Sequence, residues 1–204
     1  MNIHRALSDV ADIRAQLART EEYRGFRSAA VGVSVLVLQI GCLIQQSCSI
    51  SAVTSVGNYL AVWIPVAAIS ALVAGVEMII RGRITRDAAV WRMHRQLAWQ
   101  LAPALFVGAV LTLIITSGEQ GPHRLTWSLP GIWSLVYGLG LLACSQRLPT
   151  ATRWVAMYFL ASGSLVLLAA FASQQADAWQ MLVTFGVGQT ALGLVLFWNL
   201  ERDS

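Results

Sequence analysis

Long apolar segments alternate with short polar segments along the whole chain. Each apolar segment is about 20 residues long, and the six of them cover residues 26–45, 59–80, 97–117, 127–146, 153–173 and 178–199. About 20 helical residues cross a bilayer core that is about 30 Å thick, so each segment is long enough to span a membrane. Strands of a membrane barrel would alternate polar and apolar positions over about ten residues. Since these segments do not alternate, the pattern predicts six transmembrane helices.

The distribution of arginine predicts how these helices are oriented. All 14 basic residues are arginines. Thirteen of them lie on the side that carries the N-terminus, the loops after the second and fourth segments and the C-terminus, and only Arg124 lies on the opposite side. Regions rich in arginine stay in the cytoplasm. Both termini are therefore predicted to be cytoplasmic.

The predicted fold class is all-α, a polytopic membrane bundle of six transmembrane helices in three hairpins with an N-terminal amphipathic helix. The cytoplasmic amphipathic helix takes residues 1–25, the transmembrane domain takes 26–200, and a cytoplasmic tail takes 201–204. Small residues four positions apart, such as Gly108 and Thr112, let neighbouring helices approach closely. We therefore expect a compact bundle.

Composition agrees with a membrane protein. Hydrophobic residues make up 56% of the chain and charged residues 12%, about half of the roughly 25% usual in soluble domains. So little charge cannot cover the surface of a water-soluble enzyme, and so apolar a chain is not disordered. The use of arginine without lysine indicates a GC-rich genome. The predicted location is therefore a bacterial inner membrane.

The N-terminal region carries a second kind of apolar pattern. Ile3, Val10 and Leu17 recur every seven residues among charged side chains, which predicts an amphipathic helix over residues 2–20. Two and a half heptads are short for a stable coiled coil. Either the lipid headgroups or a protein partner can take its apolar face, and pairing with a second copy of the chain remains open.

The cytoplasmic segment 81–96 mixes arginines with apolar residues. Its members include Arg86, Trp91 and Arg92. This composition predicts a short helix that lies on the inner membrane surface. Like the N-terminal helix, it is a candidate contact for a protein partner or for the membrane surface.

Hydrogen-bonding side chains recur near the middle of five predicted spans. They are Ser34, Ser70, Tyr137, Ser162, Gln189 and Thr190. If they face one cavity, they form a neutral binding site for a small molecule. The alternative is hydrogen bonding between helices, at about 0.6 kcal/mol per bond. Gln189 is the most informative of them, because a primary amide at the bilayer centre needs partners.

Glu77 is the one formal charge well inside a predicted span. A carboxylate in the membrane is a candidate site for a proton or a cation. The alternative is an ion pair with Arg81, which follows at i+4 in the favourable order.

Residues that carry enzyme chemistry are sparse. His4, His94 and His123 all lie outside the predicted spans, so no span supplies a histidine base or a haem ligand. No phosphate-binding or dinucleotide motif is present, and we predict no cofactor and no metal site. Cys42 and Cys48 at the outer end of the first span are either a disulfide or two free thiols.

The fourth predicted span begins with the motif L-P-G-x-W-x-x-x-Y-G, from Leu129 to Gly138. With the polar N-terminal helix, this motif resembles a family of uncharacterised bacterial six-span membrane proteins. The family has no established activity, and its motifs are packing motifs. Its members often carry histidine at the position of Gln189, so this chain departs from the family there.

These features favour a non-catalytic integral membrane protein, an accessory, scaffold or regulatory subunit that acts through its cytoplasmic face. One alternative is a small-solute carrier or pore that uses the mid-membrane polar groups and Glu77. A second alternative is a membrane enzyme with a lipid-like substrate, although no acid–base pair is visible. The expected partners are membrane lipids and a cytoplasmic protein. No nucleic acid is expected, because the arginines lie between spans.

Overall fold

The computed structural model describes residues 28–50, 55–85, 88–117, 125–146 and 148–201. Within these residues the protein is all-α, and six helices are long and apolar enough to cross a membrane. Their spans are Ala30–Ser47, Val56–Ile80, Arg95–Ser117, Thr126–Cys144, Thr152–Ser173 and Ala178–Asn199. The six predicted segments are thus confirmed, and the chain is a multi-pass membrane protein. The predicted N-terminal amphipathic helix, with Ile3, Val10 and Leu17, lies outside the described residues.

The first five spans are regular helices, and the sixth changes its winding along its length. The regular helices are α2 (Ser28–Ser47), α3 (Val56–Thr85), α4 (Ala88–Ser117), α5 (Leu129–Cys144), which follows the 3₁₀ turn η1 (Thr126–Ser128), and α6 (Thr152–Ser173). The sixth span consists of α7 (Ala178–Met181), the π-helical η2 (Leu182–Val187), α8 (Gly188–Leu196) and the π-helical η3 (Phe197–Glu201).

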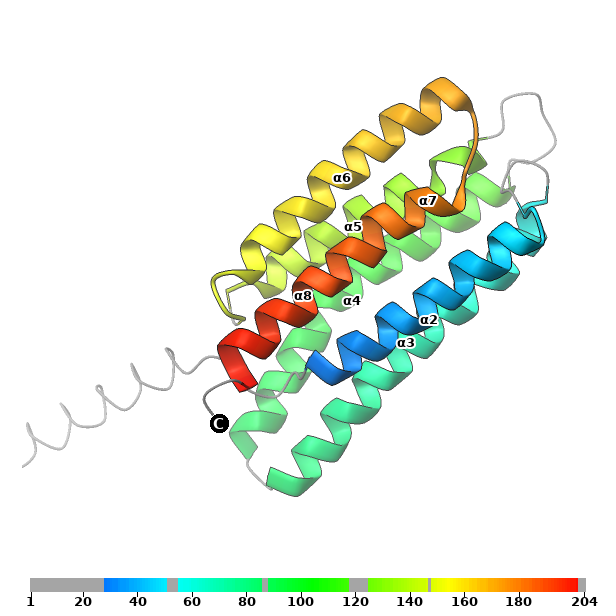
Figure 1. Ribbon diagram of the computed structural model, residues 1–204. Coiled ribbons are helices and arrows are strands. Elements are labelled where there is room, and N and C mark those ends of the chain that lie inside the picture. The colour runs from blue at the N-terminus through cyan, green and yellow to red at the C-terminus, as the bar shows by residue number, and fades with distance from the viewer. Residues whose placement is uncertain (1–27, 51–54, 86–87, 118–124, 147, 202–204) are drawn as a thin grey trace, which may run out of the picture.

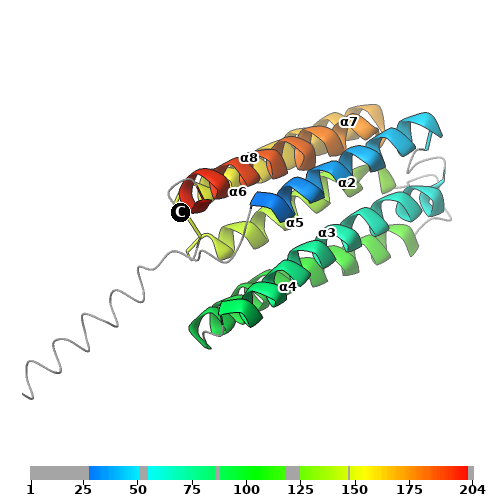
Figure 2. The ribbon, with the colours of Figure 1, turned by 60° about the horizontal axis from the view of Figure 1, so that its bottom comes forward.

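Consecutive spans pack against each other, and α2 also packs against α8, so the first and last spans are neighbours (Figure 1). Figure 2 shows α3 and α4 as a layer beneath α2, α5, α6 and α8. We call the end at which α2, α4 and α6 begin the inner end, and the end at which α3, η1 and α7 begin the outer end. The span of α5 is the most deeply buried and that of α4 the least.

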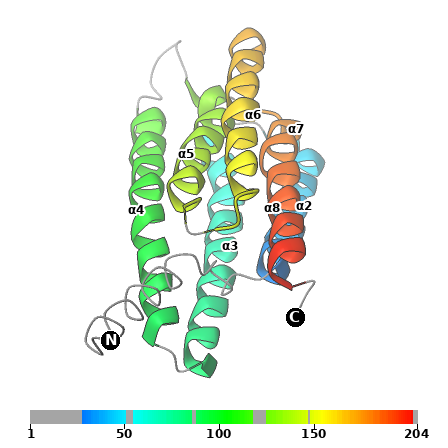
Figure 3. The ribbon, with the colours of Figure 1, turned by 90° about the vertical axis from the view of Figure 1, so that its left-hand side faces the viewer.

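The two helices α3 and α4 are longer than a membrane requires. Each has 30 residues, about 45 Å at 1.5 Å per residue, and their inner ends extend beyond those of the other helices (Figure 3). The prediction of a separate surface helix within residues 81–96 is therefore wrong: α3 continues to Thr85 and α4 begins at Ala88. Residues 88–102 contain neither proline nor glycine, so the sequence has no helix breaker where α4 passes from its polar to its apolar part.

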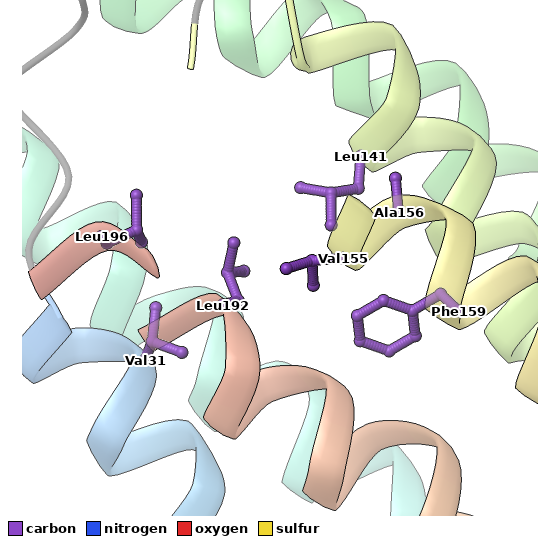
Figure 4. Close-up of a cluster of buried hydrophobic side chains, with 7 residues drawn as sticks. All are labelled: Val31, Leu141, Val155, Ala156, Phe159, Leu192 and Leu196. Atoms are coloured by element: carbon purple, nitrogen blue, oxygen red, sulfur yellow. The ribbon is translucent and has the colours of Figure 1, made fainter. Parts of the chain in front are cut away.

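The two larger apolar clusters of the described residues lie one toward each end of the bundle. At the inner end, side chains from α2, α5, α6 and α8 converge (Figure 4), namely Val31, Leu141, Val155, Ala156, Phe159, Leu192 and Leu196. At the outer end, Leu38, Tyr59, Trp63, Leu129, Ala176 and Met181 form the second cluster. The outer cluster contains more aromatic residues than the inner one. The polar contacts described in the next section lie beside one of these two clusters.

Candidate functional site: polar contacts within the bundle

The motif that opens α5 packs this helix closely against α6. A Cβ atom added at Gly131 would lie 2.9 Å from Leu167 Cβ and 3.0 Å from the carbonyl oxygen of Gly163. One turn further, the Ser134 hydroxyl donates a 2.9 Å hydrogen bond to the carbonyl of Phe159. The glycine and the serine of the motif thus bring two backbones together, which is how helices associate in lipid.

The aromatic residues of the same motif bind two other helices. Trp133 Nε1 donates to Thr112 Oγ1 of α4 at 2.8 Å. The Tyr137 hydroxyl accepts a 2.9 Å hydrogen bond from Gln189 Nε2 of α8. The motif residues of α5 therefore contact α4, α6 and α8, and α5 is the hub of the bundle.

The structure brings together two of the predicted mid-membrane residues, Gln189 and Tyr137. The other four donate hydrogen bonds to carbonyls of their own helices, as Ser and Thr side chains commonly do. These bonds are Ser34 to Ala30, Ser70 to Val66, Ser162 to Phe159 and Thr190 to Gly186. No hydrogen bond in the described residues joins these four hydroxyls to one another or to Gln189.

The Gln189–Tyr137 pair lies in aromatic surroundings. The ring of Tyr137 lies 4.9 Å from that of Phe159 and 5.7 Å from that of Phe185, measured between centroids. Gly188, beside Gln189, approaches the Phe159 ring so closely that an added Cβ would lie 2.4 Å from it. An amide and a phenol in such a setting form a neutral, tightly packed contact between α5 and α8.

The π-helical segment η2 directly precedes this pair. In a π-helix the backbone bonds run from i to i+5, and such segments often occur at functional sites. The Tyr158 hydroxyl of α6 donates to the carbonyl of Val183 within η2. A side chain of α6 is thus hydrogen-bonded to the backbone of the π-helical part of the sixth span.

The sequence did not lead us to single out Gln45 at the outer end. In the structure its side chain is buried, with 3% of its surface exposed. Its Nε2 donates to the carbonyl of Ala176 at 3.1 Å, and its Oε1 accepts from Trp63 Nε1 at 2.9 Å. The residue thus ties the first hairpin to the loop before α7. A signal was present, because Gln45 follows Leu38 and Cys42 at helical spacing on one face.

Buried polar atoms without a hydrogen-bond partner lie at both ends of the described bundle. The hydroxyls of Tyr59 and Thr126 and Oε1 of Gln180 lie at the outer end, and Oε1 of Gln100 and the Thr152 hydroxyl lie toward the inner end. Tyr59 packs beside Trp63 and stacks on Trp133 at a centroid distance of 6.1 Å. An unpaired buried polar group costs about 1–3 kcal/mol, so these atoms lower the stability of the bundle at both ends.

The remaining predicted residues lie at or near the helix ends. Glu77 is half-buried on α3, near the inner end of its span, while the side chain of Arg81 lies outside the description. Trp91 and Arg92 are exposed on α4, and Arg86 lies outside the described residues. Cys42 and Cys48 are free thiols, and Cys42 Sγ lies 3.8 Å from the carbonyl oxygen of Ala178.

Comparison with known proteins gives no match. No family model matches the chain, and no curated protein and no solved structure matches it. These comparisons therefore identify no family for the chain. Among the described residues, no group of three or more His, Cys, Asp or Glu side chains could hold a metal ion.

Proposed function

We propose that this protein is a non-catalytic subunit of a bacterial inner membrane, which holds or regulates a partner protein at its cytoplasmic face. The observation that carries the proposal is the continuation of α3 and α4 beyond their membrane spans. The span of α3 ends at Ile80 and the helix at Thr85, and α4 begins at Ala88 before its span starts at Arg95. At 1.5 Å per residue, the two helices project by about 7–10 Å.

This projection, which we call the α3–α4 tip, has the properties of a docking element. Both of its described parts, the end of α3 up to Thr85 and the start of α4 from Ala88, are helical. Arg83 and Arg92 are exposed on it, and α4 contains no acidic residue. A cationic helical surface fits a partner with an acidic face, because complementary charge guides association and fixes orientation.

The interior of the bundle supports a scaffold more than a carrier. Four of the six predicted mid-membrane groups bond within their own helices, and Gln189 and Tyr137 bond to each other. The α5 hub links three neighbouring helices by side-chain hydrogen bonds and glycine contacts. Of the two helices that form the α3–α4 tip, α4 packs directly against this hub.

Site-specific photocrosslinking tests the proposal in intact membranes. A photoreactive residue at position 83 or 92 should capture a partner protein, and charge reversal of the other arginine (Arg92→Glu with the probe at 83, Arg83→Glu with the probe at 92) should reduce the capture. A matched probe at the exposed Thr150, in the other inner loop, is the control. The proposal fails if no partner is captured at the tip, or if the control captures the same protein equally well. Deleting residues 1–20 in parallel shows whether the N-terminal region is also required.

A further inference from the structure

One face of α4 carries aromatic and cationic side chains where the helix enters the membrane. Trp91, Arg95 and Trp99 are spaced by four residues, so they form one stripe along the helix. All three are exposed, Trp99 to 72%. On the other side of α4, Leu97 is buried against Cys144 of α5, with Leu148 packed beside them. This packing fixes the rotation of α4, so the stripe faces away from the bundle and toward lipid.

The depth of the stripe matches the headgroup layer. Arg95 is the first residue of the α4 span, with Trp99 one turn inside the boundary and Trp91 one turn outside it. Tryptophan prefers this interfacial zone. The span limits set by hydropathy therefore lead us to expect the guanidinium of Arg95 near the lipid phosphates, and α4 itself supplies no carboxylate to neutralise it.

We infer that this stripe binds the headgroup of an anionic glycerophospholipid, with the phosphate at Arg95. The planar guanidinium can donate two parallel hydrogen bonds to a phosphate, a geometry that lysine lacks. The two tryptophan rings flank the headgroup.

The lipid stripe is distinct from the proposed protein contact. The lipid contact uses the outward face of α4 at the membrane boundary. The protein contact uses Arg83 and Arg92 on the α3–α4 tip beyond the boundary. Either can therefore fail in an experiment while the other stands.

Native mass spectrometry of the full-length protein tests the inference. The protein is released from nanodiscs that contain equal parts of phosphatidylglycerol and phosphatidylcholine, and the retained lipids are counted. A basic residue near an anionic surface contributes about 1 kcal/mol, or about fivefold in affinity. Arg95→Gln should therefore lower the retained phosphatidylglycerol about fivefold, Arg95→Lys should lower it less, and the control Arg83→Gln should leave it within about twofold of the wild-type value.

Three outcomes would overturn the inference. The wild type could retain both lipids equally, Arg95→Gln could have no effect, or Arg83→Gln could lower retention as much as Arg95→Gln. The last result would indicate a diffuse response to net charge instead of a site. A shift of the Arg95→Gln variant from dimer to monomer, with unchanged lipid retention, would assign the stripe to contact between two copies of the chain.

Discussion

Gly188 shows how one missing side chain shapes the middle of the bundle. It lies on α8 against the buried ring of Phe159, which also packs against Tyr137 and Phe185. Since rings surround Phe159 on several sides, it cannot move away from a larger residue at position 188. The close approach of α8 to α6 therefore depends on this glycine.

Gly188→Ala should lower the free energy of unfolding by about 1–3 kcal/mol, the usual cost of overpacking a core. The control is Gly193→Ala in the same helix, where an added Cβ meets Val31 at an ordinary 3.5 Å, so the alanine should be neutral or stabilising. Thermal unfolding in detergent measures both. Equal stability of the two variants would contradict the role assigned to Gly188.

Gln45→Leu should destabilise the protein by about 1–2 kcal/mol, because it removes two hydrogen bonds and leaves the buried indole N–H of Trp63 without its acceptor. The neighbouring Gln46 is exposed, so Gln46→Leu is the matched control and should have little effect. Chemical denaturation in mild detergent compares them. If both variants lost the same amount of stability, the loss would come from removing a polar side chain at the helix end and not from the hydrogen bonds of Gln45.

The contrast between Gln189 and the hydroxyl residues shows what a sequence reveals at this scale. A primary amide at mid-membrane depth has to find a partner, and Gln189 finds Tyr137. A serine or threonine can bond to the carbonyl four residues earlier, as Ser34 does. Its presence in a sequence therefore does not reveal whether it faces a cavity, a neighbouring helix or lipid.

At the scale of elements, span positions follow directly from hydropathy, whereas helix length beyond the membrane does not. Apolar composition sets the parts of α3 and α4 that cross the bilayer, but a polar continuation is compatible with either a turn or more helix. The π-helical winding of η2 is also invisible in the sequence, since apolar residues tolerate either pattern of backbone bonds. The α5 motif was recognisable, but the three helices that it contacts were not.

Tyr158→Phe should loosen η2, because the phenol donates a hydrogen bond to the carbonyl of Val183. We expect faster amide hydrogen exchange in residues 182–188, with little change in α5. Tyr137→Phe is the control, since it removes a contact with the Gln189 side chain and leaves that carbonyl bond intact. Exchange measured by mass spectrometry in detergent is decisive. Unchanged exchange in the segment would show that η2 does not depend on α6.

At the scale of the whole molecule, six spans place the N- and C-terminal ends of the described chain on the same side. The arginine distribution predicts that this side is cytoplasmic. Helix packing alone does not determine which side is cytoplasmic, because that depends on how the chain inserts into the membrane.

Cysteine accessibility in spheroplasts tests the orientation. After Cys42, Cys48 and Cys144 are replaced by serine, Gln175→Cys should react with an impermeant maleimide from outside. Arg83→Cys should react only after the membrane is permeabilised. Both positions are exposed, so intrinsic reactivity is comparable. Labelling of both from the same side would refute the six-span topology, and the reverse pattern would refute the predicted orientation.

The π-helical winding of η2 has a consequence for how this chain can vary. A π turn holds about one residue more than an α turn, and one residue corresponds to a rotation of about 100° in an α-helix. Met181 and Gln189 are eight residues apart, and both now face the bundle. If a single residue within Leu182–Val187 were deleted and the segment rewound as an α-helix, the two would be seven residues apart, which is about two turns, and they would still share a face. Loss of one codon in this segment would therefore leave the helical phase of the sixth span unchanged, whereas the same loss in a regular span would rotate one half of it against the other.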